Sequence, residues 1–149
     1  MKTNNIKIMP MSVSDLDSIK LTLESDFDDF WNYNVLKSEL NNPNSKYIVA
    51  KIDNTIVGFA GFIILYDEAD ISNIVVNKNY RHMGIGTLML EELICMAKSL
   101  NLNSLNLEVN SSNVFAINLY KNFSFVENGF RKNYYNNSDD AILMRLNLK

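Results

Sequence analysis

The sequence predicts one α+β domain, a mixed α/β fold in which strands and helices alternate along the chain. The alternation follows from changes in hydrophobic period along the chain. Three observations support a single domain. The chain has 149 residues, within the roughly 100 to 200 that one domain usually contains. Hydrophobic residues make up 47% of it, enough for a sizeable core. No Pro/Gly/Ser-rich linker, repeat or long charge run divides it. We therefore expect a single domain over residues 1–149.

Two short helices are expected before the main sheet, after a first strand over Ile6–Met9. Ser14 and Asp17 have the spacing of a capping box, which predicts the start of a helix. A second helix, through Leu36, is expected to end before Pro43, because proline disfavours helical geometry in the residue that precedes it.

Three strands follow these helices. Asp53 and Asn54 separate two runs rich in β-forming residues, Tyr47–Ile52 and Thr55–Leu65, and this arrangement predicts a hairpin. Ile71–Val76 is expected to be the next strand.

Helical and strand periods alternate again in the second half. Apolar residues recur at helical spacing over Thr87–Leu100, whereas apolar and polar residues alternate over Leu105–Val109. Asn113 is a suitable cap for another helix. Two closing strands are expected around Phe125–Tyr134 and Ala141–Leu148.

Composition excludes several classes of function. A net charge of −3 and a pI near 5.1 disfavour a nucleic-acid-binding domain and attraction to anionic lipid. The apolar runs are too short to span a bilayer and the amino terminus lacks a signal-peptide pattern, so we expect a cytoplasmic protein without a membrane partner. One cysteine and one histidine cannot form a zinc cluster, and no metal site is expected. The oligomeric state stays open.

The segment Arg81–Thr87 joins a strand to the strongest helix and contains Gly84 and Gly86. Glycines allow backbone N–H groups to turn inward, and a helix N-terminus carries about half a positive charge, so the segment predicts a phosphate site. A P-loop needs a Gly-Lys pair that is missing, and a Rossmann motif needs a third glycine where Met89 stands. A plain glycine turn into a helix is the alternative interpretation.

The pattern R-x-x-G-x-G in this setting resembles the acetyl-CoA pyrophosphate loop of the GNAT superfamily of N-acetyltransferases. The resemblance covers the chain in register from Tyr47 onward and is weaker before it. Segments similar to the ribosomal-protein-alanine N-acetyltransferase branch are Asp67–Ala69, Ile71–Val76, Leu107–Val109, Ser112–Asn113, Ala116–Ile117, Leu119–Tyr120, Arg131, Asn133–Tyr135, Asp140–Ile142 and Met144. The resemblance implies the GNAT fold, a mixed, mostly antiparallel sheet flanked by helices, whose splayed central strands form an acetyl-CoA cleft.

The resemblance also implies which residues bind acetyl-CoA, the expected co-substrate. The strand residues Ile74, Val75 and Val76 are expected to offer backbone groups to the pantetheine arm. The arm would pair with this strand much as an added strand does. The pyrophosphate is expected to lie on the loop residues His82, Met83, Gly84, Ile85, Gly86 and Thr87. Asn113 is expected to contact the same molecule. His82 and Met83 are expected to act mainly through their backbone.

Acetylation of an amine needs a base for the amine and an acid for the leaving thiolate. If Leu107 lies in the core, Glu108 points to the other face of its strand. The resemblance places the cleft there, so Glu108 is the candidate base, directly or through water. Its modest basicity suits an N-terminal amine, with a pKa near 8, better than lysine, with a pKa of about 10.4. The alternative is a carboxylate that only faces solvent.

Tyr120 is the candidate acid, on the helix that follows the strand of Glu108. A phenol can protonate a thiolate, which is only a moderately strong base. The alternative is packing, since Ala116 and Tyr120 lie four residues apart on one helix face.

Trp31, Tyr134 and Tyr135 are the candidate residues of a peptide groove, as the resemblance implies. The acceptor it implies is the N-terminus of a ribosomal protein. Acidic side chains of this chain would attract such a basic partner, although a solvated acidic face is the commoner explanation of these charges. At two positions relevant to this groove, the sequence differs from the usual family pattern. Ser124 stands where the family usually has glycine, and Phe30 stands where proline is usual; we expect Ser124 to avoid a strongly positive φ.

We therefore expect an acetyl-CoA-dependent Nα-acetyltransferase, with alanine at the N-terminus of the acceptor and direct transfer in a ternary complex. Two alternatives stay open at this point. One is an acetyltransferase for a small amine, such as a polyamine or an aminoglycoside. The other is a non-catalytic module that binds acyl-CoA.

Overall fold

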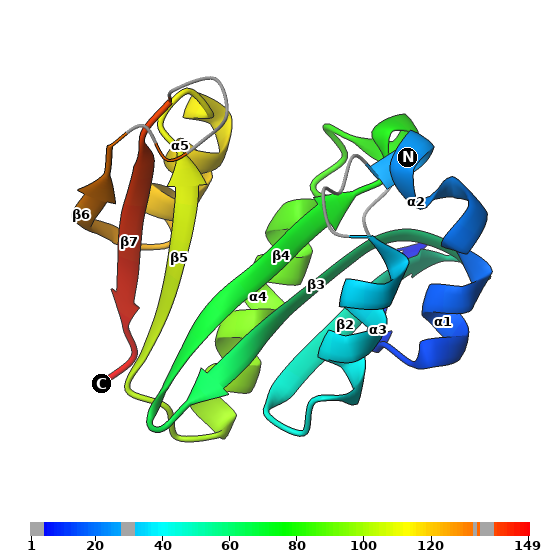
Figure 1. Cartoon of the computed structure of the whole chain (residues 1–149), viewed down its shortest axis with the longest axis horizontal. Helices are drawn as coiled ribbons and strands as arrows, with labels where there is room; N and C mark the ends of the chain where they lie inside the picture. Colours follow the sequence, from blue (N-terminus) through cyan, green and yellow to red (C-terminus); the bar gives the residue numbers. More distant parts are fainter. Residues whose placement is uncertain (1–4, 28–31, 133, 135–138) are drawn as a thin grey trace.

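Seven strands form one sheet in the computed structural model of the chain (Figure 1). The structure describes residues 5–27, 32–132, 134 and 139–149. The strands are β1 (Ile6–Pro10), β2 (Ser45–Ile52), β3 (Thr55–Leu65), β4 (Glu68–Val76), β5 (Ser104–Asn110), β6 (Val126–Arg131) and β7 (Ala141–Asn147). Their order in the sheet is β1-β2-β3-β4-β5-β7-β6. Every described pair is antiparallel except β4–β5, which confirms the predicted mixed, mostly antiparallel sheet.

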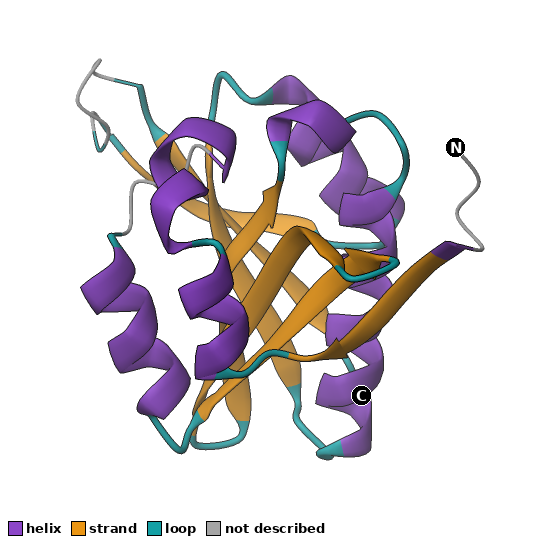
Figure 2. Ribbon diagram, turned by 90° about the vertical axis from the view of Figure 1, so that its right-hand side faces the viewer, coloured by secondary structure: helices purple, strands orange, loops and turns teal. Residues whose placement is uncertain are grey.

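Helices flank both faces of the sheet (Figure 2). They are α1 (Val13–Ser18), the 3₁₀ turn η2 (Lys20–Thr22), α2 (Leu23–Phe27), α3 (Tyr33–Asn41), the 3₁₀ turn η3 (Lys78–Tyr80), α4 (Ile85–Ser99) and α5 (Val114–Asn122). One core cluster joins α4 and α5 to the sheet through Phe62, Leu90 and Ile117. A second cluster, with Leu36 and Phe59, joins α1–α3 to the other face. Within the described residues, no helix is long and apolar enough to cross a membrane.

The two central strands separate along their length, as predicted. β4 and β5 pair only where Glu68–Asp70 lies beside Ser104–Asn106. Beyond these residues a β-bulge at Ser72 interrupts the pairing of β4 with β3. A bulge bends its strand and increases the local twist. β4 and β5 then diverge toward their carboxyl ends, as Figure 1 shows, and the splay opens the sheet at its centre.

The expected cap of the first helix is wrong by two residues. Ser12, not Ser14, caps α1: the Ser12 hydroxyl accepts a hydrogen bond from the Asp15 backbone at 3.1 Å, and the Asp15 carboxylate accepts one from the Ser12 backbone at 2.8 Å. Asp15 also pairs with Lys51 of β2 at 3.1 Å. Both serines have a suitable aspartate three residues later, and this contact with β2 favours the earlier one.

β4 begins at Glu68, three residues before the predicted start at Ile71. The Glu68 carboxylate accepts hydrogen bonds from Asn106 at 3.0 Å and from Arg145 at 3.1 and 3.3 Å. The bond from Asn106, together with Arg145, lowers the pKa of Glu68. A charged residue thus belongs to the strand because β5 and β7 supply its partners, which hydrophobic period alone does not reveal.

Other boundaries also differ from the prediction, and two of them lie beside functional candidates. α4 begins at Ile85 rather than Thr87, because Gly84 adopts a left-handed conformation and serves as the N-cap. β6 spans Val126–Arg131 instead of Phe125–Tyr134, since the residue before Val126 is buried and belongs to the turn that ends α5.

A serine in a left-handed conformation ends α5. Ser124 has φ of 73°, which contradicts the expectation that it avoids a strongly positive φ. Its backbone N–H donates to Lys121 O at 2.9 Å, and that of Phe125 donates to Tyr120 O at 3.1 Å. These two bonds form a Schellman motif, which glycine usually completes. Hydrogen bonding and the burial of Phe125, which is 2% exposed, outweigh the strain at Ser124.

We expect Ser124→Gly to stabilise the protein by about 0.5–1 kcal/mol. Relief of left-handed strain is worth about 1–2 kcal/mol, and the greater freedom of glycine in the unfolded chain offsets part of that gain. Urea unfolding measures the difference. The matched control is Ser38→Gly on the exposed side of α3, which should lower stability by about 0.5–1 kcal/mol. Equal losses in both variants would contradict the assignment of strain to Ser124.

Candidate active site

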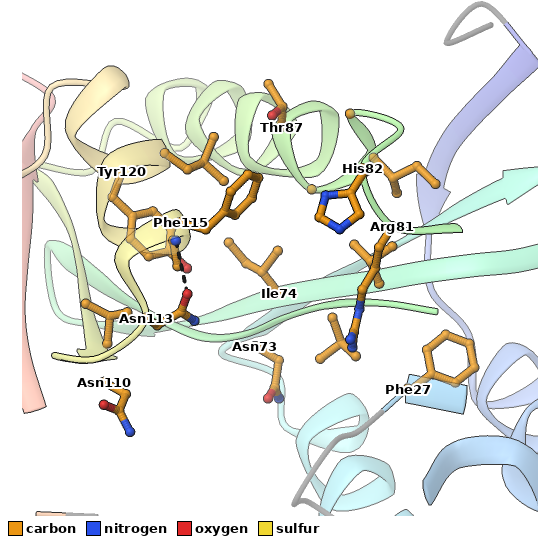
Figure 3. A pocket seen from close by; sticks show the side chains of 18 of the residues that line it. Phe27, Asn73, Ile74, Arg81, His82, Thr87, Asn110, Asn113, Phe115 and Tyr120 are labelled. Atoms are coloured by element: carbon orange, nitrogen blue, oxygen red, sulfur yellow. Dashed lines mark hydrogen bonds between the residues drawn. The ribbon is translucent and has the colours of Figure 1, made fainter. Parts of the chain in front are cut away.

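A cavity of about 610 Å³ lies where β4 and β5 diverge. Figure 3 shows its surroundings: Asn113, Phe115 and Tyr120 of the α5 segment on one side, and Arg81, His82 and Thr87 on the other. The volume is typical of sites for small molecules, about 300–1,000 Å³. The cavity brings together most of the residues expected to bind acetyl-CoA.

The loop before α4 has the geometry of an anion site. His82 and Gly84 both have positive φ, 64° and 82°. The backbone N–H groups of this loop therefore point in directions that extended or right-handed helical backbone does not give them. The N-cap residue Gly84 has no side chain that could accept a hydrogen bond from the first turn of α4. The N-terminus of this 15-residue helix therefore offers backbone donors and a positive dipole end to a ligand in the cavity.

His82, Gly84, Ile85, Gly86 and Thr87 all line the cavity. Met83 does not: its side chain packs against the core on the α4 side of the sheet. A Cβ atom added at Gly86 would meet only Val76 Cγ2, at 3.9 Å, so the backbone of the first turn is open toward the cavity.

The β4 residues Ile74, Val75 and Val76 form another wall of the cavity. On one side β4 pairs with β3 up to Val76. On the other side its described pairing with β5 ends at Asp70. The cavity edge of β4 therefore offers backbone donors and acceptors to an extended ligand, as an unpaired strand edge does.

Asn113 lines the cavity and also caps α5, as predicted. Its side-chain oxygen accepts a hydrogen bond from the Ala116 backbone at 3.1 Å, drawn in Figure 3. This bond fixes the amide at the cavity wall.

Glu108 points to the face of β5 opposite Leu107, as predicted, and lines the cavity. Leu107 is 5% exposed and lies in the core, whereas the Glu108 side chain is 33% exposed. The Glu108 carboxylate pairs with Arg131 Nη2 of β6 at 3.2 Å. The carboxylate thus has a fixed cationic partner and remains accessible to solvent.

Tyr120 is half-buried and lines the same cavity from α5 (Figure 3). Its ring packs on Phe125, with ring centroids 5.8 Å apart. Because Tyr120 and Phe125 also share a bond of the Schellman motif, the turn at Ser124 holds the ring in place. The packing and catalytic interpretations of Tyr120 are therefore compatible.

Of the candidate groove residues the structure describes Tyr134, which does not line this cavity. Tyr134 lines a second cavity, beside Arg131. Trp31 and Tyr135 lie outside the described residues, as does Phe30. Among the residues that the structure describes, no group of three His, Cys, Asp or Glu side chains is placed to hold a metal ion.

Several lining residues were not predicted as site residues. Arg81 and Phe115 line the cavity, and the Phe115 ring meets that of His82 edge-on at 6.1 Å. Buried Asn73 donates to the Tyr47 hydroxyl at 3.1 Å beneath the cavity. Arg81 was visible in the R-x-x-G-x-G pattern, whereas Phe115 and Asn73 carry no sequence signal for this place.

Known proteins resemble the chain in sequence and structure. A Bacillus subtilis protein provisionally named [ribosomal protein bS18]-alanine N-acetyltransferase is 34% identical over 136 residues, 90% of each chain. The Escherichia coli K12 [ribosomal protein bS18]-alanine N-acetyltransferase is 35% identical over 115 residues, 74% of this chain and 78% of that one. The crystal structure of the E. coli ribosomal-protein-S18-alanine N-acetyltransferase superposes with a TM-score of 0.88 at 29% identity, covering 97% of this chain and 94% of that one.

The fold also matches a GNAT family acetyltransferase from Elizabethkingia anophelis solved with acetyl-CoA bound, with a TM-score of 0.78 at 22% identity over 97% of this chain and 99% of that one. The acetyltransferase (GNAT) family model matches residues 13–125, which include the strand of Glu108 and the helix of Tyr120. Since this match spans most of the chain and both named relatives exceed 30% identity over more than two thirds of it, the chain belongs to the GNAT family of acetyltransferases and is an acyltransferase.

Proposed function

We propose that the chain transfers the acetyl group of acetyl-CoA to the N-terminal α-amine of a ribosomal protein, with alanine as the acceptor residue. Transfer is direct, in a ternary complex. We also propose that residues 1–149 act as one domain and that the reaction takes place in the cytoplasm, where ribosomal proteins are made.

One observation supports this type of reaction: a single cavity has a helix N-terminus suited to an anion, and both Glu108 and Tyr120 on its walls. The GNAT family uses acetyl-CoA, which carries a pyrophosphate and an acetyl thioester. The loop of His82 and Gly84 suits the former. The unpaired edge of β4 suits the pantetheine arm that joins the two groups.

Glu108 and Tyr120 supply the two proton transfers of the reaction. As the amine nitrogen bonds to the carbonyl carbon, Glu108 accepts a proton from the nitrogen, directly or through water. The carbon–sulfur bond then breaks, and the Tyr120 hydroxyl gives a proton to the thiolate. A backbone N–H near Val76 stabilises the charge on the carbonyl oxygen.

The acceptor is inferred from the name of the E. coli relative, a [ribosomal protein bS18]-alanine N-acetyltransferase. To test this acceptor, the purified chain is incubated with acetyl-CoA and with ribosomal proteins from cells that lack the chain. The N-termini of the ribosomal proteins are then analysed by mass spectrometry. We expect one N-terminal alanine to gain an acetyl group. Acetylation of spermidine or an aminoglycoside, with no change in any protein N-terminus, would overturn the proposal in favour of a small-amine enzyme.

Gly86→Asp tests the phosphate site. The added Cβ has room beside Val76, and a carboxylate in the first turn of α4 suits the helix dipole, so the fold should be unharmed. The new negative charge would repel the pyrophosphate, and we expect the Kd for acetyl-CoA to rise about 100-fold. Gly86→Ala is the matched control and should bind within a few-fold of the parent chain. Calorimetry measures both, and unchanged affinity in Gly86→Asp would contradict the site.

A further inference from the structure

A second cavity, of about 1050 Å³, adjoins the first. Ser72 and Glu108 line both cavities, so the two meet at the candidate base. The second cavity extends from there across β5 toward β7 and β6 and includes Arg131 and Tyr134. If acetyl-CoA occupies the first cavity, as proposed above, an amine reaches Glu108 from the second.

The described side chains of the second cavity are almost balanced in charge. Three carboxylates, Glu68, Asp70 and Glu108, face two guanidinium groups, Arg131 and Arg145. Each guanidinium pairs with a carboxylate: Arg145 with Glu68 at 3.1 Å, and Arg131 with Glu108 at 3.2 Å. A net charge of 2 − 3 = −1 gives this cavity little general attraction for polycations.

Arg131 is held next to the base by two contacts. Besides its ion pair with Glu108, its guanidinium lies over the Tyr134 ring, 5.5 Å from the ring centroid. Arg131 itself belongs to β6, an edge strand whose described residues are all exposed, and its side chain is 56% exposed. Its charge therefore acts at the site without contributing to the core.

An amine that is hydrogen-bonded to either oxygen of Glu108 lies within about 9 Å of the Arg131 guanidinium, since the Glu108–Arg131 contact is 3.2 Å. This separation is comparable with the Debye length of about 8 Å at physiological salt, so the charge of Arg131 reaches the amine and weakens the attraction that Glu108 exerts on a charged amine. Near pH 7.5 about a quarter of N-terminal α-amines are neutral, against about one lysine amine in a thousand. Arg131 thus affects an α-amine, of which a fraction is neutral, less than a lysine or polyamine amine, which is almost fully charged.

We propose that Arg131 determines acceptor specificity by disfavouring, at Glu108, amines that are almost fully charged near neutral pH. It favours the α-amine of a polypeptide over lysine side chains and polyamines. This inference rests on the proposed function, because it takes Glu108 as the base and the second cavity as the entry of the acceptor.

The test measures kcat/KM for three acceptors with the parent chain, Arg131→Gln and Arg131→Lys. The acceptors are a lysine-free peptide with N-terminal alanine, the same peptide with a blocked N-terminus and one lysine, and spermidine. In Arg131→Gln, we expect activity on the lysine peptide to rise about tenfold relative to the alanine peptide, and that on spermidine to rise more. Arg131→Lys keeps the charge and should keep the parent ratios.

Salt supplies a second readout that a merely structural role of Arg131 would not move. Raising ionic strength from about 0.05 to 1 M shortens the Debye length to about 3 Å, so the preference of the parent chain for the α-amine should weaken. In Arg131→Gln the preference should change much less. Thermal unfolding shows that the variants are folded, and Arg131→Met replaces Arg131→Gln if the latter is not.

The inference is overturned if Arg131→Gln lowers activity on all three acceptors by one common factor, because Arg131 would then only orient Glu108. The parent chain separates this outcome from failure of the proposed function. If the parent acetylates spermidine and not the alanine peptide, the proposed function and the role of Arg131 are both overturned before any variant is compared. If the parent prefers the alanine peptide and the ratios do not move, the role of Arg131 alone is wrong.

Discussion

Glu108→Gln should lower kcat by about 100-fold or more at saturating substrate, with little change in the Kd for acetyl-CoA. Glutamine keeps the size and planar shape of the side chain and removes the proton acceptor. Glu108 lies on β5 where the two cavities meet, whereas the loop proposed to bind the pyrophosphate precedes α4, so the substitution should affect chemistry more than acetyl-CoA binding. Steady-state kinetics at pH 7–8 and calorimetry measure the two quantities.

Glu127→Gln is the matched control for this change. Glu127 is an exposed carboxylate on β6, the same strand that carries Arg131, and it does not line either cavity. The Glu127→Gln substitution changes the net charge by the same amount as Glu108→Gln. The kcat of this control should stay within about twofold of the parent value. If kcat of Glu108→Gln also stayed within twofold, Glu108 would not be the base.

The order of the elements was predictable because hydrophobic period changes sharply along this chain. The hairpin around Asp53 and Asn54, helix α4 and the alternating strand β5 are each encoded by neighbouring residues. For the same reason Glu108 could be placed opposite the core face from its position beside Leu107. Local patterns were enough for these features.

Boundaries and partners that depend on distant residues were not predictable in the same way. The choice of Ser12 over Ser14 as a cap depends on contact between Asp15 and Lys51 of another element. Glu108 meets Arg131 only because β7 pairs with both β5 and β6. Nothing in the spacing along the chain signals this ion pair, although the pair decides the charge beside the candidate base.

The turn at Ser124 shows how the fold supports a candidate catalytic side chain at some local cost. A left-handed serine is strained, yet the Schellman bonds it completes fix Phe125 against the Tyr120 ring. The strain therefore lies one turn from the candidate acid. Relief of the strain in Ser124→Gly should raise stability without moving the ring, because glycine completes the same motif.

Tyr120→Phe should lower kcat by about 100-fold while the thermal midpoint moves by a few degrees at most. Phenylalanine retains the ring that packs on Phe125 and removes only the hydroxyl. Packing alone predicts that both activity and stability stay near the parent values, whereas proton donation predicts a loss of activity alone. Steady-state kinetics and calorimetric unfolding distinguish the two.

Tyr66→Phe is the matched control, since Tyr66 is fully exposed and does not line either cavity. Its kcat should equal that of the parent chain. An acetyl donor with a more acidic thiol offers a sharper comparison, because a less basic thiolate needs less help from an acid, and the loss in Tyr120→Phe should shrink with it. Full activity of Tyr120→Phe on acetyl-CoA, or a loss of equal size with both donors, would sink the assignment of Tyr120 as the acid, and the proton would then come from water or another side chain.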